Sequence, residues 1–143
     1  MADSLPISDL HIFPLSRQDG RLVILHDTDH LLRRFGVLET LSLEPGASTP
    51  FNLRAEADQI LAPLDGAVDL SLMDMRVESP SHGARAEITL SAADPQGLLL
   101  PFGVACRMLS ADGAQLLRLS TSSTVPAGDR DLADGDLPEA APQ

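Results

Sequence analysis

The chain has 143 residues, with 21 acidic and 10 basic side chains and a formal net charge of -11 at pH 7. This length is enough for a single domain with one core, so no second domain is needed. The negative charge argues against nucleic acid as a partner, because the long-range field of the protein would repel a phosphate backbone.

Short apolar or alternating runs, separated by Gly, Pro, Asp and Ser, fill the sequence from residue 10 to residue 120. In one run, Val68, Leu70 and Leu72 fall on one face and polar residues on the other, which is typical of a half-buried antiparallel strand. In chain order, the predicted strands are residues 21–26, 37–43, 59–64, 67–74, 85–90, 97–101, 104–109 and 114–120. They predict an all-β fold of about eight or nine strands, arranged as a sandwich or jelly-roll barrel.

Turn signals built on glycine lie between these runs and are predicted to separate the strands. They occur at Asp19-Gly20, Pro45-Gly46, Asp65-Gly66, Ser81-His82-Gly83, Pro101-Phe102-Gly103 and Asp112-Gly113.

Two segments depart from the strand pattern. Residues 28–34, TDHLLRR, predict one short helix, in which Thr28 or Asp29 would cap the first turn. From residue 122 onwards the sequence is acidic and rich in Pro and Ala, with few apolar residues. We therefore expect a domain over residues 1–121 and a disordered or loosely attached tail over residues 122–143.

The sequence also bears on the cellular setting of the protein. No apolar run approaches the ~20 residues of a membrane helix, and the N-terminal residues do not read as a secretory signal. The single cysteine, Cys106, excludes an intramolecular disulfide and a multi-cysteine zinc site. We expect a protein of the reducing cytoplasm that does not contact a membrane.

Missing residue types exclude several kinds of catalysis. All 10 basic residues are arginine, so Schiff-base chemistry and lysine general-base catalysis are excluded. Trp and Tyr are absent, which removes tyrosine as an acid.

Residues 46–66 resemble the first motif of the cupin superfamily, which reads glycine, His-x-His, glutamate and glycine at fixed spacing. Gly46 is followed by five residues, Asn52-Leu53-Arg54, four residues, Gln59, six residues and Gly66. The turn at Pro101 is similar to that of the second cupin motif, with Cys106 in place of its histidine. Asn52, Arg54, Gln59 and Cys106 thus stand at the four metal-ligand positions of the superfamily.

Within cupins, residues 73–110 look most like the dTDP-4-dehydrorhamnose 3,5-epimerases (RmlC-like proteins) and the related dTDP-sugar ketoisomerases. The matching elements are Asp74-Met75-Arg76, Ser79-Pro80-Ser81-His82-Gly83, Leu90-Ser91-Ala92-Ala93-Asp94 and the turn at Pro101. The resemblance covers about residues 19–121. It implies a jelly-roll β-barrel (double-stranded β-helix) that forms a homodimer and uses neither metal nor cofactor.

The resemblance also implies epimerase chemistry with a histidine base helped by an aspartate, a tyrosine acid and a cation near the enolate. Here Asn52 and Arg54 take the ketoisomerase His-x-His positions, Gln59 the epimerase lysine position and Cys106 the histidine position. Asp19 stands where the family has an arginine for the nucleotide phosphates. We assign no catalytic residue and expect these four side chains, Asn52, Arg54, Gln59 and Cys106, to form a ligand-binding barrel mouth.

Each candidate residue also has a structural interpretation. Arg54 would bind an oxyanion, or would be neutralised by Glu56 or Asp58. Cys106 would be a nucleophile only if a base made its thiolate, and it would otherwise pack as a small apolar residue.

The remaining candidates have similar alternatives. Gln59 would bind ligand or only satisfy a neighbour. His26 and His30 would suggest a metal site, although a solvated turn is the favoured interpretation, and His82 is expected on the surface.

Three functional hypotheses follow. The first is a metal-free RmlC-like cupin without the family base that binds a small polar ligand, such as a sugar or sugar nucleotide. The alternative is an active epimerase or ketoisomerase acting on a dTDP-4-keto-6-deoxy sugar, with His26 or His30 donated across a dimer. The third is a barrel that only oligomerises, and all three lead us to expect a dimer.

Overall fold

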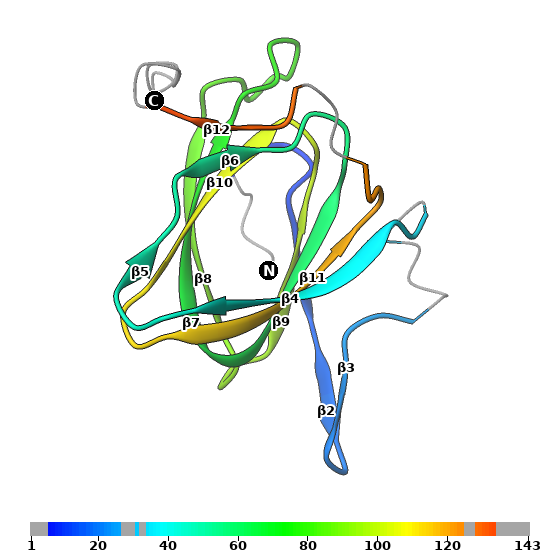
Figure 1. Cartoon of the computed structure of the whole chain (residues 1–143). Coiled ribbons are helices and arrows are strands. Elements are labelled where there is room, and N and C mark those ends of the chain that lie inside the picture. The colour runs from blue at the N-terminus through cyan, green and yellow to red at the C-terminus, as the bar shows by residue number, and fades with distance from the viewer. Residues whose placement is uncertain (1–5, 27–30, 32–33, 125–127, 134–143) are drawn as a thin grey trace.

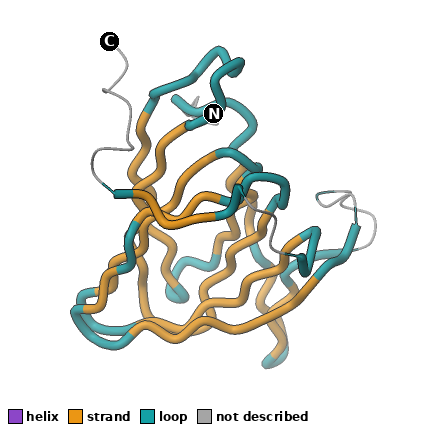
Figure 2. The backbone as a smooth tube through the Cα atoms, turned by 45° about the horizontal axis from the view of Figure 1, so that its top comes forward, coloured by secondary structure: helices purple, strands orange, loops and turns teal. Residues whose placement is uncertain are grey.

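The computed structural model describes residues 6–26, 31, 34–124 and 128–133. Within these residues every regular element is a β-strand, and Figure 2 shows strands joined by loops. The strands are β1 (His11–Pro14), β2 (Ser16–Gln18), β3 (Arg21–Val23), β4 (Val37–Leu43), β5 (Ala47–Ser48), β6 (Phe51–Leu53), β7 (Gln59–Asp74), β8 (Arg85–Ser91), β9 (Gln96–Leu100), β10 (Val104–Ser110), β11 (Ala114–Ser120) and β12 (Arg130–Leu132). The predicted all-β jelly-roll class is confirmed, and no helix of the described residues could cross a membrane.

Strand β7 organises the barrel because it belongs to both of its walls (Figure 1). The first part of β7 pairs with β9 and β11, and its second part pairs with β8 and β10. Strands β1 and β4 extend the first wall, and β5, β6 and β12 extend the second. The two walls enclose the core and position the residues described below.

The prediction that Asp65-Gly66 separates two strands is wrong, because β7 runs through it as one 16-residue strand. The register between β7 and β11 shifts between Gln115 and Leu116, as at a β-bulge. Gly66 has φ +74, and a Cβ there would collide with the carbonyl oxygen of Gly113. The glycine therefore bends the strand from one wall into the other instead of ending it.

The main core lies between the two walls, and a second cluster covers the outside of the first wall. Val68, Leu70 and Leu72 are almost completely buried, as their alternation predicted. Ile60 belongs to the outer cluster with Phe13 and is also completely buried. The first wall thus has apolar side chains packed on both of its faces.

The structure bears on two segments that depart from the strand pattern of the sequence. Most of the expected helix at residues 28–34 lies outside the described residues, and Leu31 and Arg34 are not helical. Within the expected tail, β12 pairs with β6, and Leu132 is only 6% exposed. This part of the tail therefore packs on the barrel, while the domain boundary at residue 121 stays a prediction.

Strands β2 and β3 form a separate hairpin that projects from the barrel in Figure 1. Its turn is the predicted Asp19-Gly20, with positive φ at both residues. The sequence did not predict the short strands β1, β2, β5 and β12.

Candidate functional site

A cavity of about 440 Å³ lies between the two walls of the barrel. Its size falls within the range of small-molecule sites. The lining residues come from β4, the segment around β6, β10 and single positions of β7, β11 and β12. They are Thr40, Leu41, Ser42, Leu43, Thr49, Pro50, Asn52, Gln59, Cys106, Met108, Arg118 and Asp131.

Three of the four predicted site residues meet in this cavity. Asn52 and Cys106 are direct partners across the β6–β10 pair, and Gln59 begins β7 on the opposite wall. Gln59 is 5% exposed, so its amide is buried within the barrel as its position in the motif predicted. The cupin spacing thus brings residues 52, 59 and 106 together without providing a histidine.

Arg54 is the exception, because it follows the end of β6 and does not line this cavity. Its Nη1 lies 3.6 Å from Oδ2 of Asp129, so its ion-pair partner comes from the predicted tail and not from the expected Glu56 or Asp58. Arg54 and Asn52 share a shallower pocket of about 300 Å³ with residues 129–131. The expectation that Arg54 points into the main cavity is therefore corrected.

Cys106 lies in the barrel as an apolar packing residue. Burial raises the pKa of its thiol to about 12, and the positive charge of Arg118 lowers it by a smaller amount. The thiol is therefore neutral at pH 7 and is not a ready nucleophile. This supports the interpretation of Cys106 as a small buried apolar side chain.

Sequence reasoning missed Arg118, the basic residue of the cavity. Its Nη2 donates a hydrogen bond to Oε1 of Glu39, its cross-strand partner on β4. Its Nε is buried and has no hydrogen-bond partner among the described residues. A signal was present, because period-two alternation on β11 places Arg118 on the same inward face as Ala114 and Leu116.

Asp131 was missed because it lies in the predicted tail. Its Oδ1 accepts a hydrogen bond of 3.0 Å from Nδ2 of Asn52. Nearby, Oδ1 of Asp129 accepts a hydrogen bond of 2.6 Å from the backbone N–H of Ala55. These contacts attach β12 beside the cavity, and Figure 1 shows the strand along β6 at this end of the barrel.

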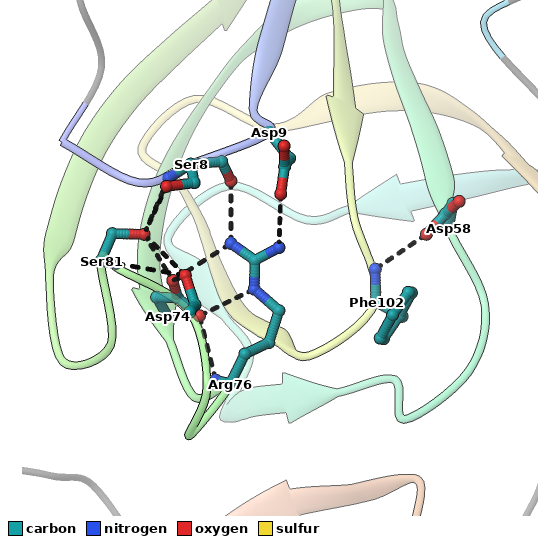
Figure 3. Close-up of polar contacts among 8 residues, drawn as sticks. Ser8, Asp9, Asp58, Asp74, Arg76, Ser81 and Phe102 are labelled. Atoms are coloured by element: carbon teal, nitrogen blue, oxygen red, sulfur yellow. Dashed lines mark hydrogen bonds and ion pairs between the residues drawn. The ribbon is translucent and has the colours of Figure 1, made fainter.

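A second polar cluster surrounds Asp74, a carboxylate that is 0% exposed (Figure 3). It accepts hydrogen bonds from Nε of Arg76 at 2.9 Å, from Oγ of Ser79 at 2.7 Å and from Oγ of Ser81 at 2.6 Å. Burial alone would raise the pKa of Asp74, but hydrogen bonds from Arg76, Ser81 and Ser79 outweigh it and hold the pKa well below its ordinary value.

Arg76 extends this cluster to the N-terminal segment. Its Nη1 lies 2.9 Å from Oδ2 of Asp9, and its Nη2 donates to the carbonyl oxygen of Ser8 at 2.8 Å. The Asp-x-Arg and Ser-Pro-Ser elements of the family resemblance thus fasten the start of the chain to the barrel. In this chain their contacts are structural.

The histidines and possible metal ligands lie apart from this chemistry. Three described histidines, His11, His26 and His82, do not line the cavity. His30 and the residues between it and His26 lie outside the described residues. In the described part of the chain, no group of three or more His, Cys, Asp or Glu side chains is placed to hold a metal ion.

No protein-family model matches the sequence, and no curated protein matches it either. Solved structures do match the fold. A dTDP sugar isomerase from Desulfovibrio desulfuricans G20 superposes with a TM-score of 0.86 at 18% identity, over 97% of this chain and 94% of that protein.

Two further structures give the same result. A double mutant of ChmJ, a 3'-monoepimerase from Streptomyces bikiniensis in complex with dTDP, has a TM-score of 0.82 at 18% identity, over 94% of this chain and 74% of that one. The rmlC epimerase of Mycobacterium tuberculosis has a TM-score of 0.82 at 14% identity, over 100% of this chain and 82% of that one. The chain therefore has the fold of these dTDP-sugar isomerase and epimerase structures.

Proposed function

We propose that this protein binds a small, polar, sugar-like molecule in its barrel cavity and does not supply the acid and base for epimerisation. The observation that carries this proposal is the set of residues lining the cavity. Among the described residues, the lining includes two amides, three hydroxyl side chains and one arginine, but no histidine, lysine or tyrosine. Proton abstraction beside a keto group needs a positioned base and a positioned acid.

Two side chains of the cavity, Cys106 and Asp131, could in principle act as a base. Cys106 is held as the neutral thiol, because burial raises its pKa. Asp131 is a carboxylate that accepts a hydrogen bond from Asn52. Its partner Asn52 is an amide, which cannot act as the acid that returns the proton. We therefore assign Asp131 to ligand binding and not to catalysis.

Hydrogen exchange at carbon tests the absence of catalysis. The protein is incubated with a dTDP-4-keto-6-deoxyhexose in deuterated water, and deuterium at C3 and C5 is measured by mass spectrometry and NMR. We expect incorporation no faster than in a protein-free sample, while an active epimerase in parallel labels both carbons. Rapid incorporation would establish the alternative, an active isomerase, and repetition with Asp131→Asn and with His26→Ala and His30→Ala would identify its base.

We also propose that the protein forms a homodimer in a reducing cytoplasm. Within the described residues, β4 pairs only with β11 and β1 only with β9, so each has one sheet edge to cover. Phe35 and Leu38 lie at the start of this β4 edge and are 69% and 53% exposed. Light scattering coupled to size-exclusion chromatography distinguishes a dimer from a monomer.

A further inference from the structure

The charges around the cavity point to the class of its ligand. Of the described residues that line it, two are charged, Arg118 and Asp131. Arg118 is already paired with Glu39, which is its register partner on β4. The guanidinium is thus largely neutralised, and Asp131 adds a negative charge.

A nucleotide diphosphate would need a different environment. Within the cavity, its phosphates would lie near a carboxylate and one already paired guanidinium, inside a protein of net charge -11. The adjoining shallow pocket adds Arg54 and Arg130, but also the carboxylates of Asp129 and Asp131. Sites for phosphate groups normally provide unpaired Arg, Lys or backbone N–H donors. In the described part of the chain, neither Phe nor His lines the cavity, so none of these residues places an aromatic ring to stack on a nucleobase.

The same lining suits hydroxyl groups. Thr40, Ser42 and Thr49 contribute hydroxyls, and Asn52 and Gln59 contribute amides that both donate and accept hydrogen bonds. The guanidinium of Arg118 contributes N–H groups to the lining from the opposite wall. Leu41, Leu43, Pro50 and Met108 supply apolar surface for the C–H faces of a small ring.

From this combination we infer that the cavity takes a neutral, polyhydroxylated molecule of monosaccharide size and discriminates against its phosphorylated and nucleotide-linked forms. This inference rests on the proposed binding function and narrows its ligand class. Two carboxylates cause this discrimination. Glu39 pairs with the guanidinium of Arg118, which is then not free for a phosphate, and Asp131 repels a negatively charged ligand.

A matched set of ligands tests the inference. Amide shifts of the labelled protein are titrated with neutral monosaccharides (D-glucose, D-fucose and L-rhamnose), with D-glucose 1-phosphate and with dTDP-glucose at constant ionic strength. We expect at least one neutral sugar to bind with shifts at the cavity residues, and glucose to bind at least about tenfold more tightly than its phosphate. Tighter binding of dTDP-glucose than of glucose overturns the ligand class but leaves the binding function standing, whereas no binding of any sugar overturns both.

Two size-conserving variants test the cause of the preference. Glu39→Gln frees the guanidinium, and Asp131→Asn removes the second carboxylate. Each is expected to change the ratio of the phosphate to the glucose dissociation constant about threefold to tenfold in favour of the phosphate. Asp69→Asn, an exposed control on β7 outside the cavity, should leave the ratio unchanged. An unchanged ratio in both cavity variants would contradict the inference.

Discussion

The two polar clusters of this barrel differ in how completely their groups are paired. Around Asp74, the buried carboxylate receives hydrogen bonds from Arg76, Ser79 and Ser81. In the cavity, Arg118 keeps a buried Nε without a partner. A fully satisfied buried network stabilises one conformation, whereas the amides and hydroxyls that line the cavity can pair with a ligand.

This difference separates two kinds of likeness to the RmlC group. The sequence elements that match the family most closely lie in the Asp74 cluster, where their contacts hold the fold. The positions at which the family pattern has reactive side chains lie in or beside the cavity, where this chain has Asn52, Arg54, Gln59 and Cys106. The likeness to the family pattern is thus stronger in the contacts that hold the fold than in the side chains at the cavity.

The strongest test of this contrast is the removal of the Asp74 charge. Asp74→Asn leaves the Arg76 guanidinium near the barrel without its buried partner, so we expect the free energy of unfolding to fall by about 3 kcal/mol. Urea denaturation measures this free energy of unfolding. Asp69→Asn, an exposed residue on the same strand, should change it by less than about 0.5 kcal/mol. Equal effects of the two variants would show that the Asp74 cluster is not a special source of stability.

Acid should act through the same carboxylate. The folded-state pKa of Asp74 lies below its unfolded value, so its contribution is complete above about pH 4 and is lost as the pH falls further. Stability measured between pH 6 and pH 2, in steps, should therefore fall more steeply in the wild type than in Asp74→Asn. Parallel curves for the two proteins would contradict the assignment.

The attachment of β12 should depend on the pair of Arg54 and Asp129. Arg54→Ala leaves the nearly buried Asp129 carboxylate without its cation, and we expect a loss of about 2 kcal/mol. Limited proteolysis should then cut after residue 121 earlier than in the wild type. Arg107→Ala, an exposed arginine on β10, is the control, and the same cleavage rate in both variants would argue against this role.

The smallest expected effect concerns Cys106. Because its folded-state pKa is raised to about 12, the unfolded chain releases the thiol proton first as the pH rises above about 9. Stability should therefore fall by about 1 kcal/mol between pH 9 and pH 10. Denaturation curves of wild type and Cys106→Ala at both pH values isolate this loss, and a loss of the same size in Cys106→Ala would refute its assignment to the thiol.

Much of the barrel could be predicted because strands buried on one side alternate in sequence. The run at Val68, Leu70 and Leu72 is such a case, and β4 and β11 have the predicted bounds. The bend at Gly66 could not be predicted, because Asp-Gly is compatible with both a hairpin turn and a bulge. Strand β12 was hidden by a polar composition, since it pairs through its backbone and buries little more than Leu132.

Three of the four predicted site residues lie in the cavity, so the candidate site could be predicted in part. Motif spacing placed Asn52, Gln59 and Cys106 in one cavity. It misplaced Arg54, which follows the end of β6 and pairs with Asp129 of a distant segment. Arg118 lay within an apolar strand, so only the face it occupies distinguished it from an ordinary surface arginine.

The most direct test of the account uses the methionine methyl groups as probes. Met108 lines the cavity, whereas Met73 is completely buried and is not part of the cavity lining. The Met108 signal therefore reports ligand binding, and the Met73 signal reports any change in the fold as a whole. In a protein labelled with ¹³C at the methionine methyls, titration with the neutral sugars should shift the Met108 signal to saturation and leave Met73 in place. An unmoved Met108 signal at saturating sugar, with the fold intact, would contradict the claim that this cavity is a sugar-binding site.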